Sequence, residues 1–326
     1  MKLVRIAVAA GLVLGLVACG SSANNGSGGA NNAGSGGSSA STATLRVAAN
    51  GNAGVLPLIV AQKQGYFKDQ GLNIQFTKAA SIANLPQALG TSYDIVFTVP
   101  TVVLQANAQG VDLVPVAGAT LQDQSNKQSF LIASQKSGVK NLADLAGKTI
   151  GTPTVGGTLN LATKVLLKQA GVDPASIKYL QISATNLGAQ LKQGRVDAVE
   201  AVAPFSAAIL ADKTNVNLGS CYRALGDSVA AIGWVAKKDW ASAHKDEITR
   251  FTAALDQGIE YIKANESEAR AELQKFSGIP AAVLSQAALP TFTSEVRESD
   301  WKAWSSAMRQ IDGSEGQVNL DSLFNW

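Results

Sequence analysis

The residues that build metal centres and disulfide frameworks are scarce in this chain. Its 326 residues include one His and two Cys, too few for a His/Cys cluster that binds zinc or iron and too few for a set of disulfides. Only 16% of the residues are charged, and a formal net charge of +3 is weak for this length, which argues against a nucleic-acid partner. We therefore expect no metal and no cofactor.

Apolar residues, in contrast, are abundant. They make up 46% of the chain, which also contains 31 Gly. A chain with this composition is not disordered, and its length predicts one or two domains with a sizeable core.

The N-terminus has the features of a signal peptide. Lys2 and Arg5 give it a positively charged start, and the apolar run that follows is too short to span a bilayer comfortably. The sequence LVACG at 16–20 resembles a bacterial lipobox, so we expect Cys19 to be acylated and to become the mature N-terminus. The alternative is an ordinary secretory signal with an incidental Cys.

Cleavage before Cys19 changes the composition of the mature chain. It removes two basic residues and leaves 25 basic against 24 acidic residues. Residues 20–43 contain only Gly, Ser, Ala, Asn and Thr, and we interpret them as a flexible tether. Cys221 remains as the only free thiol. Because the only His, His244, lies in a sequence typical of a solvated helix boundary, we do not expect a catalytic Cys–His pair.

The rest of the chain predicts strands and helices in alternation, which favours an α/β fold with mostly parallel sheets flanked by helices. Strands are expected at 45–49, 72–77, 94–98, 111–117, 129–134, 149–152, 177–182, 198–202 and 230–236. Helices are expected at 55–64, 82–89, 100–108, 158–170 and 187–193, after Pro204, and through 238–312. The pattern predicts two similar lobes and a helical C-terminal section, with ligands bound at the carboxyl ends of the strands.

Four motifs resemble the solute-binding proteins of ABC importers, in the subgroup that serves nitrate, sulfonates, taurine and pyrimidine precursors of thiamine. They are GYFKDQGL at 65–72, YDIV at 93–96, NLADLAGKTIG at 141–151 and QGRVDA at 193–198. The resemblance extends over about residues 45–265. The first and third motifs in this order are specific, whereas each alone would be weak.

The resemblance implies a periplasmic-binding-protein-like fold in which the second lobe is inserted into the first. The implied division is a signal peptide at 1–18, a lipidated Cys and linker at 19–43, the first lobe at 44–125, the second lobe at 126–236, and the rest of the first lobe with the C-terminal helices at 237–326. It also implies a monomer that binds one small solute and delivers it to an ABC permease and ATPase. The lipid anchor would hold this monomer on the extracytoplasmic face of the cell membrane.

Two loops of the first lobe are candidate ligand sites because each connects a strand to a helix. The loop NGNAG at 50–54 offers Asn52 and N–H groups at a helix start. The loop TVPT at 98–101 offers the hydroxyls of Thr98 and Thr101. A plain Gly-rich turn and an ordinary helix cap, respectively, are the alternatives.

The third candidate loop, TPTVGGT at 152–158, belongs to the second lobe. Its Gly156 and Gly157 let the backbone approach a ligand closely, and Thr154 and Thr158 add hydroxyls. In the relatives that the chain resembles, the matching loop contacts the solute. It is not a P-loop, because the Lys-Ser/Thr ending is absent.

The fourth candidate loop, VEAVAPF at 199–205, carries a carboxylate in an apolar strand. Glu200 either binds an amine or ring N–H of the ligand or forms a structural pair with Arg223 or a Lys. Phe205 and Trp234 either stack on a planar solute or belong to the core.

The four loops contain neither Arg nor Lys. An anion would therefore be held by N–H dipoles and hydroxyls, which disfavours nitrate. With Glu200 in the site, a zwitterion similar to taurine or a neutral heterocycle fits better than a plain anion.

Three functions remain open at this point. A solute-binding lipoprotein of an importer is favoured. A pyrimidine-synthase-like enzyme on the same fold resembles a chemistry that uses an active-site His and iron, whereas His244 lies outside every candidate loop. The third possibility is a sensing or adhesive lipoprotein without a permease. We expect no enzymatic activity.

Overall fold

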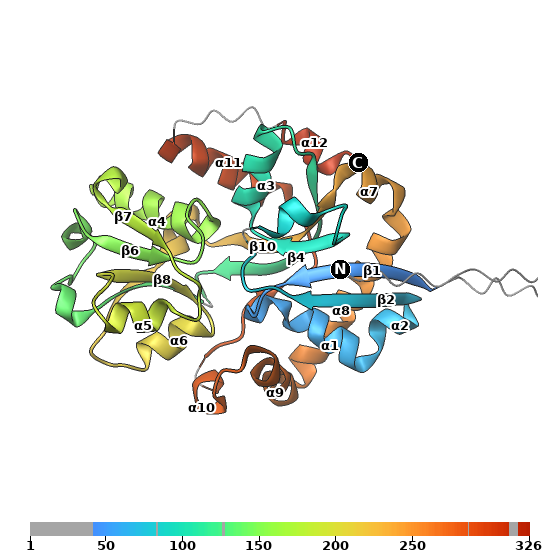
Figure 1. The fold of residues 1–326 in the computed structure, drawn as a ribbon, viewed down its shortest axis with the longest axis horizontal. Helices are drawn as coiled ribbons and strands as arrows, with labels where there is room; N and C mark the ends of the chain where they lie inside the picture. Colours follow the sequence, from blue (N-terminus) through green and yellow to red (C-terminus); the bar gives the residue numbers. More distant parts are fainter. Residues whose placement is uncertain (1–41, 83, 126–127, 286, 313–318) are drawn as a thin grey trace, which may run out of the picture. The chain divides into compact units, whose positions relative to one another are not determined.

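The computed structural model describes all residues except 1–41, 83, 126–127, 286 and 313–318 (Figure 1). The predicted signal peptide, the acylation site at Cys19 and the tether up to residue 41 therefore lie outside the described residues. The described residues belong to one compact unit, Ala40–Trp326. Within them, none of the helices combines the length and the apolar character that a membrane crossing needs.

The first sheet has the strand order β11-β4-β10-β3-β1-β2. Its strands are β1 (Ala43–Ala49), β2 (Leu72–Lys78), β3 (Ile95–Thr98), β4 (Leu113–Asp123), β10 (Ser228–Lys237) and β11 (Thr291–Phe292). The strand β1 runs parallel to β2 and β3, whereas β10 runs antiparallel to both β3 and β4. The strands β3 and β4 are nearly all buried, as expected of a sheet with helices on both faces, whereas the edge strand β2 has several exposed residues.

The second sheet has the strand order β7-β6-β8-β5-β9. Its strands are β5 (Ser129–Ala133), β6 (Thr149–Thr152), β7 (Lys178–Gln181), β8 (Ala198–Val202) and β9 (Val216–Ser220). The strand β6 is parallel to β7 and β8, and β5 is antiparallel to β8 and β9.

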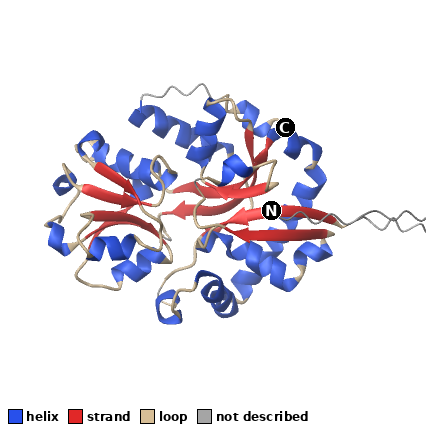
Figure 2. Cartoon of the chain, viewed as in Figure 1, coloured by secondary structure: helices blue, strands red, loops and turns tan. Residues whose placement is uncertain are grey.

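Helices flank both sheets (Figures 1 and 2). The α-helices are α1 (Leu56–Gln64), α2 (Tyr66–Asp69), α3 (Pro100–Ala108), α4 (Thr158–Gln169), α5 (Leu187–Lys192), α6 (Phe205–Leu210), α7 (Lys238–Ala243), α8 (Lys245–Ala264), α9 (Glu266–Ser277), α10 (Ala281–Leu284), α11 (Glu298–Asp312) and α12 (Asp321–Phe324). The long helix α8 packs its apolar stripe against α1, while α11 contacts both α3 and α4. In the second sheet, α4 covers one face, and α5 and α6 cover the other (Figure 1).

The α/β class with two helix-flanked sheets is confirmed, but several details of the prediction are wrong. Each sheet is mixed and not mostly parallel, because β4, β5 and β10 run against their neighbours. The expected helix at 82–89 is only a 3₁₀ turn, Leu85–Ala88, since Pro86 lacks the N–H group that a longer helix needs. The C-terminal section also contains β11, and β9 is not predicted.

The strand expected at 230–236 is assigned to the second lobe in the sequence analysis, whereas β10 belongs to the first sheet. It pairs with β3 and β4 along its length. A pattern of alternating apolar residues predicts a strand but not its neighbours. The boundaries of the two lobes stay a prediction.

Candidate functional site

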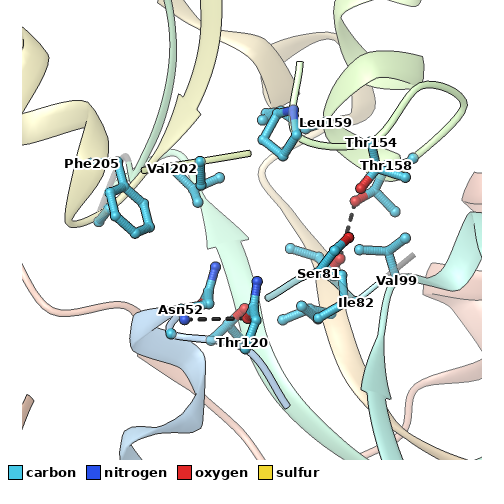
Figure 3. A pocket seen from close by; sticks show the side chains of 18 of the residues that line it. Asn52, Ser81, Ile82, Val99, Thr120, Thr154, Thr158, Leu159, Val202 and Phe205 are labelled. Atoms are coloured by element: carbon cyan, nitrogen blue, oxygen red, sulfur yellow. Dashed lines mark hydrogen bonds between the residues drawn. The ribbon is translucent and has the colours of Figure 1, made fainter. Parts of the chain in front are cut away.

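A cavity of about 330 Å³ is lined by loops from both sheets (Figure 3). We call the residues 50–52, 78–82, 99, 120 and 122 the first wall, and the residues 153–154, 157–159, 183–185, 202–203 and 205 the second wall. The first wall contains the residues that follow β1, β2 and β3, and the second wall contains those that follow β6, β7 and β8. These strands end at the same edge of their sheets, which is where α/β proteins bind ligands.

Two helices, α3 and α4, and the 3₁₀ turn that precedes α1 begin at these walls. Asn52 caps the 3₁₀ turn before α1, because its side-chain oxygen accepts a hydrogen bond from the Gly54 N–H group at 2.7 Å. Val99 precedes α3, and Gly157 precedes α4. The first N–H groups of a helix lack carbonyl partners within that helix and carry partial positive charge, so the walls favour a negatively charged ligand group.

Lys78, at the end of β2, supplies the only charged side chain among the described residues that line the cavity. Its ammonium group donates a hydrogen bond to the carbonyl of Phe276 and lies 4.6 Å from the centre of that ring. Lys78 is not among the predicted site residues, which include none from the end of the second strand. Since β2 is parallel to β1, its carboxyl end faces the same edge, and that signal was present in the sequence.

The hydroxyl group of Thr158 connects the start of α4 to the first sheet. It donates to the carbonyl of Ala231 in β10 at 3.1 Å and accepts from the hydroxyl of Tyr222 at 3.1 Å. Its proton is thus committed to the protein, and only its second lone pair is left for a ligand. Tyr222 also lines the cavity, although it is not among the predicted site residues, and this bond holds it in place.

Glu200 does not line the cavity. Its side chain is fully buried on the face of β8 that α4 covers, and the Asn160 amide nitrogen donates to its Oε1 atom at 3.2 Å. Of the alternatives for Glu200, a structural pair with Arg223 is not formed, because that guanidinium donates to the carbonyls of Leu218 and Ser220 instead. Burial raises the pKa of Glu200 to about 7, against the opposing influence of neighbouring polar groups and of the positive charge on Lys164.

The other predicted site residues divide into two groups. Five of the ten predicted ligand-binding residues line the cavity, namely Asn52, Thr154, Gly157, Thr158 and Phe205. Thr98, Thr101, Gly156, Glu200 and Trp234 are not among its lining residues. Trp234 is a core residue, since its ring lies 4.8 Å from that of Phe97 and 5.7 Å from that of Phe251. Contact between any of these residues and a ligand stays a prediction.

The residues considered for catalysis lie elsewhere. The ring of His244 stacks on Trp240, and its Nδ1 atom lies 2.8 Å from the Trp240 carbonyl oxygen. Cys221 is buried, and burial raises the pKa of its thiol. In the part of the chain that the structure describes, no group of three or more His, Cys, Asp or Glu residues is arranged to hold a metal ion.

Comparisons with known proteins agree with this architecture. The family model described as "NMT1/THI5 like" matches residues 52–269. A Haemophilus influenzae protein named for thiamine biosynthesis is 27% identical over 215 residues, which cover 65% of this chain. The match spans 66% of that relative, slightly less than two thirds of its length.

Solved structures of two binding proteins have the same fold. The alkanesulfonate-binding protein of Xanthomonas axonopodis pv. citri, solved with MOPS bound, is 20% identical, with a TM-score of 0.71 over 86% of this chain and 95% of that chain. The nitrate-binding protein of Synechocystis PCC 6803 is 11% identical, with a TM-score of 0.74 over 87% of this chain and 86% of that chain. The periplasmic-binding-protein-like fold expected from the sequence motifs is confirmed.

Proposed function

Because the chain belongs to the NMT1/THI5-like family, we propose that it is an extracytoplasmic solute-binding protein that captures a small organic solute in the cavity between its two walls and delivers it to an ABC importer. The cavity is the observation that carries this proposal. It lies at the carboxyl ends of the parallel strands, and polar backbone and side-chain groups line it on both walls.

The solute class that the walls favour is a small organosulfonate. Lys78 and the starts of α3 and α4 supply positive potential, and hydroxyl and amide groups supply hydrogen bonds to a sulfonate oxygen. The lining residues include no Asp or Glu within the described chain. The ammonium group of taurine therefore lacks a carboxylate partner, and we place simple alkanesulfonates ahead of taurine, unlike the expectation based on Glu200.

A pyrimidine precursor of thiamine is the second candidate. The aromatic side chains of Phe205 and Tyr222 both line the cavity and offer faces for a planar ring. The relative named for thiamine biosynthesis supports the same class. Nitrate is a weaker candidate, because one small ion would leave most of a cavity of about 330 Å³ unfilled.

We further propose that the chain is a lipoprotein. The lipobox-like sequence ending at Cys19 and the polar tether after it support anchoring of a monomer to the outer face of the membrane, close to a permease and its ATPase. Metabolic labelling with an alkyne fatty acid is expected to label the wild-type protein and not the Cys19→Ser variant. Labelling of both proteins would contradict this part of the proposal.

Isothermal titration of the purified protein with ethanesulfonate, taurine and 4-amino-5-hydroxymethyl-2-methylpyrimidine tests the solute class. We expect ethanesulfonate to bind more tightly than taurine. Mass spectrometry of any solute that copurifies extends the test beyond this panel. Binding of the pyrimidine alone would favour the second candidate, and consumption of a bound compound would overturn the assignment as a binding protein without enzymatic activity.

A further inference from the structure

Two hydrogen bonds, both made by the amide of Asn160, connect the buried carboxylate of Glu200 to the loop of the second wall. Neighbouring residues of β8 point to opposite faces of the sheet, so Val199 and Ala201 pack with the cluster under α5 and α6 while Glu200 faces α4. Its Oε1 atom accepts from the Asn160 amide nitrogen at 3.2 Å. Its Oε2 atom meets no donor in full hydrogen-bonding geometry among the described residues, although the hydroxyl groups of Thr152 and Thr163 lie close enough to lower the pKa of this carboxyl. A buried acceptor that is only partly satisfied lowers the stability of the fold.

The other end of the Asn160 amide holds the loop of the second wall. Its carbonyl oxygen accepts from the backbone N–H group of Gly156 at 3.1 Å. Gly156 has a φ angle of 77°, a conformation that favours glycine, and it stands between Thr154 and Gly157, which both line the cavity. The bond to Asn160 therefore fixes the turn from which the second wall is built.

We propose that Glu200 is a positioning residue for this wall: as a carboxylate it orients the Asn160 amide, which in turn fixes the Gly156 turn in the geometry that binds solute. A carboxylate can only accept hydrogen bonds, so it must face the amide nitrogen, and the amide oxygen is then left for the Gly156 N–H group. A protonated Glu200 can itself donate to the amide oxygen, which frees the amide to rotate. The inference rests on the proposed function, because the loop matters only if the cavity binds solute.

Protonation of Glu200 falls in the neutral range, because burial raises its pKa to about 7. The titratable groups that face it are Lys164 of α4, Tyr179 of β7, and Cys221 and Tyr222 after β9. Burial raises the pKa of Tyr179, of Cys221 and of Tyr222, so these three groups stay neutral between about pH 5 and pH 8.5. Lys164 contributes a positive charge that favours the ionised carboxylate. Solute affinity should therefore weaken as the pH falls through 7.

Solvent exchange of the Gly156 amide tests the positioning role without any ligand. We would measure it by NMR on the full mature protein labelled with ¹⁵N-glycine, and divide each rate by the intrinsic rate at the same pH. Protection in the wild-type protein should fall about three- to tenfold between about pH 8.5 and about pH 5.5, the factor expected for one hydrogen bond of ordinary net strength. In the Glu200→Gln variant protection should not change with pH.

The matched control is Asp197→Asn, which replaces a carboxylate next to the start of β8. Asp197 accepts from the Thr149 N–H group at 2.8 Å and does not line the cavity. In the Asp197→Asn variant, protection of the Gly156 amide should depend on pH as it does in the wild-type protein. Gly156 protection that does not change with pH in the wild-type protein would overturn the proposal. The same pH dependence in Glu200→Gln as in the wild type would also overturn it. The wild-type measurement is decisive even if a variant does not fold.

Titration with ethanesulfonate at the same pH values tests the proposed solute class separately from the positioning role of Glu200. The affinity of the wild-type protein is expected to fall in parallel with Gly156 protection, and that of Glu200→Gln to stay constant. If ethanesulfonate does not bind while Gly156 responds to pH, the proposed solute class is wrong and the positioning of the loop stands. If ethanesulfonate binds with an affinity that does not change with pH while Gly156 responds, the link between the loop and solute binding is overturned.

Discussion

The two walls of the cavity carry charge at different depths. In the first wall the charge is the ammonium group of Lys78, on an exposed side chain that reaches the carbonyl of Phe276. In the second wall the lining side chains are uncharged, and the charge lies one layer behind them, on Glu200. An exposed charge acts on a ligand directly and is weakened by solvent, whereas a buried charge acts through the groups that it orients.

This difference assigns separate tasks to the two walls. The first wall attracts the ligand, and the second wall fixes the shape of the site. The fold stability should reflect this division, because a buried carboxylate lowers stability unless its desolvation is compensated. Four experiments test this division of tasks between the two walls.

The largest effect should come from the core behind the first wall. Trp234→Ala removes a side chain that is 1% exposed and packs against Phe97 and Phe251, so we expect the free energy of unfolding in urea to fall by about 3–5 kcal/mol. Phe205→Ala, in the second wall, should destabilise by less than about 2 kcal/mol because this ring is half-buried. Equal losses would show that Trp234 is not the core residue described above.

The buried charge behind the second wall should appear as a pH dependence of stability. The folded state raises the pKa of Glu200 from 4.5 to about 7, so it holds a proton that the unfolded state releases. Stability from this group is complete below pH 4.5 and is lost as the pH rises through 7, by roughly 3 kcal/mol at most. Urea unfolding across this range should show the loss in the wild-type protein, and Glu200→Gln should remove most of it. A Glu200→Gln curve parallel to that of the wild type would contradict the burial of this charge.

The hydrogen bonds of Thr158 should contribute less. Thr158→Val removes the bonds to Ala231 and Tyr222 and leaves the Tyr222 hydroxyl buried, so we expect a loss of about 1–2 kcal/mol in thermal unfolding. Thr154→Val, on the same wall and half-exposed, should change stability by less than about 0.5 kcal/mol. A stable Thr158→Val variant with lost affinity would mean that this hydroxyl serves the ligand.

The smallest effect should come from the exposed charge of the first wall. Lys78→Met keeps the apolar stem and removes the ammonium group, so we expect ethanesulfonate to bind up to about fivefold more weakly, with a smaller dependence on salt. Lys63→Met is the control, because Lys63 bonds to Glu268 and Glu272 and does not line the cavity. Unchanged affinity in Lys78→Met would remove this cation from the binding site.

Much of the fold could be predicted from the sequence because local patterns determine it. The strand β8 and the helix α4 are found within one residue of their expected ends, since apolar periodicity and turn residues mark them. The partners of β10 could not be predicted, because pairing depends on distant strands. The apolar pattern at 82–89 predicts a helix, but Pro86 limits it to the 3₁₀ turn Leu85–Ala88.

The candidate site was less predictable than the fold. All four predicted loops contribute lining residues to the cavity. The depth of each side chain could not be predicted: contact of Glu200 with a ligand was one of two alternatives, and this side chain lies behind the cavity wall. A sequence shows that a carboxylate interrupts an apolar strand, and it does not show which neighbouring helix satisfies it. The Asn160 amide and the Tyr222 hydroxyl lie 40 and 64 positions along the chain from Glu200 and Thr158, respectively.

The pairing of β10 with β4 has an irregularity at the cavity. Ala230 lies opposite Leu121 and Ile232 lies opposite Thr120, so Ala231 is an extra residue without a partner in β4. Its carbonyl is the one that accepts from Thr158. Because this contact uses the backbone, small substitutions at Ala231 should leave it intact, whereas deletion of that one residue would remove the acceptor. Among relatives, an insertion or deletion at this position should therefore change the bond to Thr158, whereas a substitution should not.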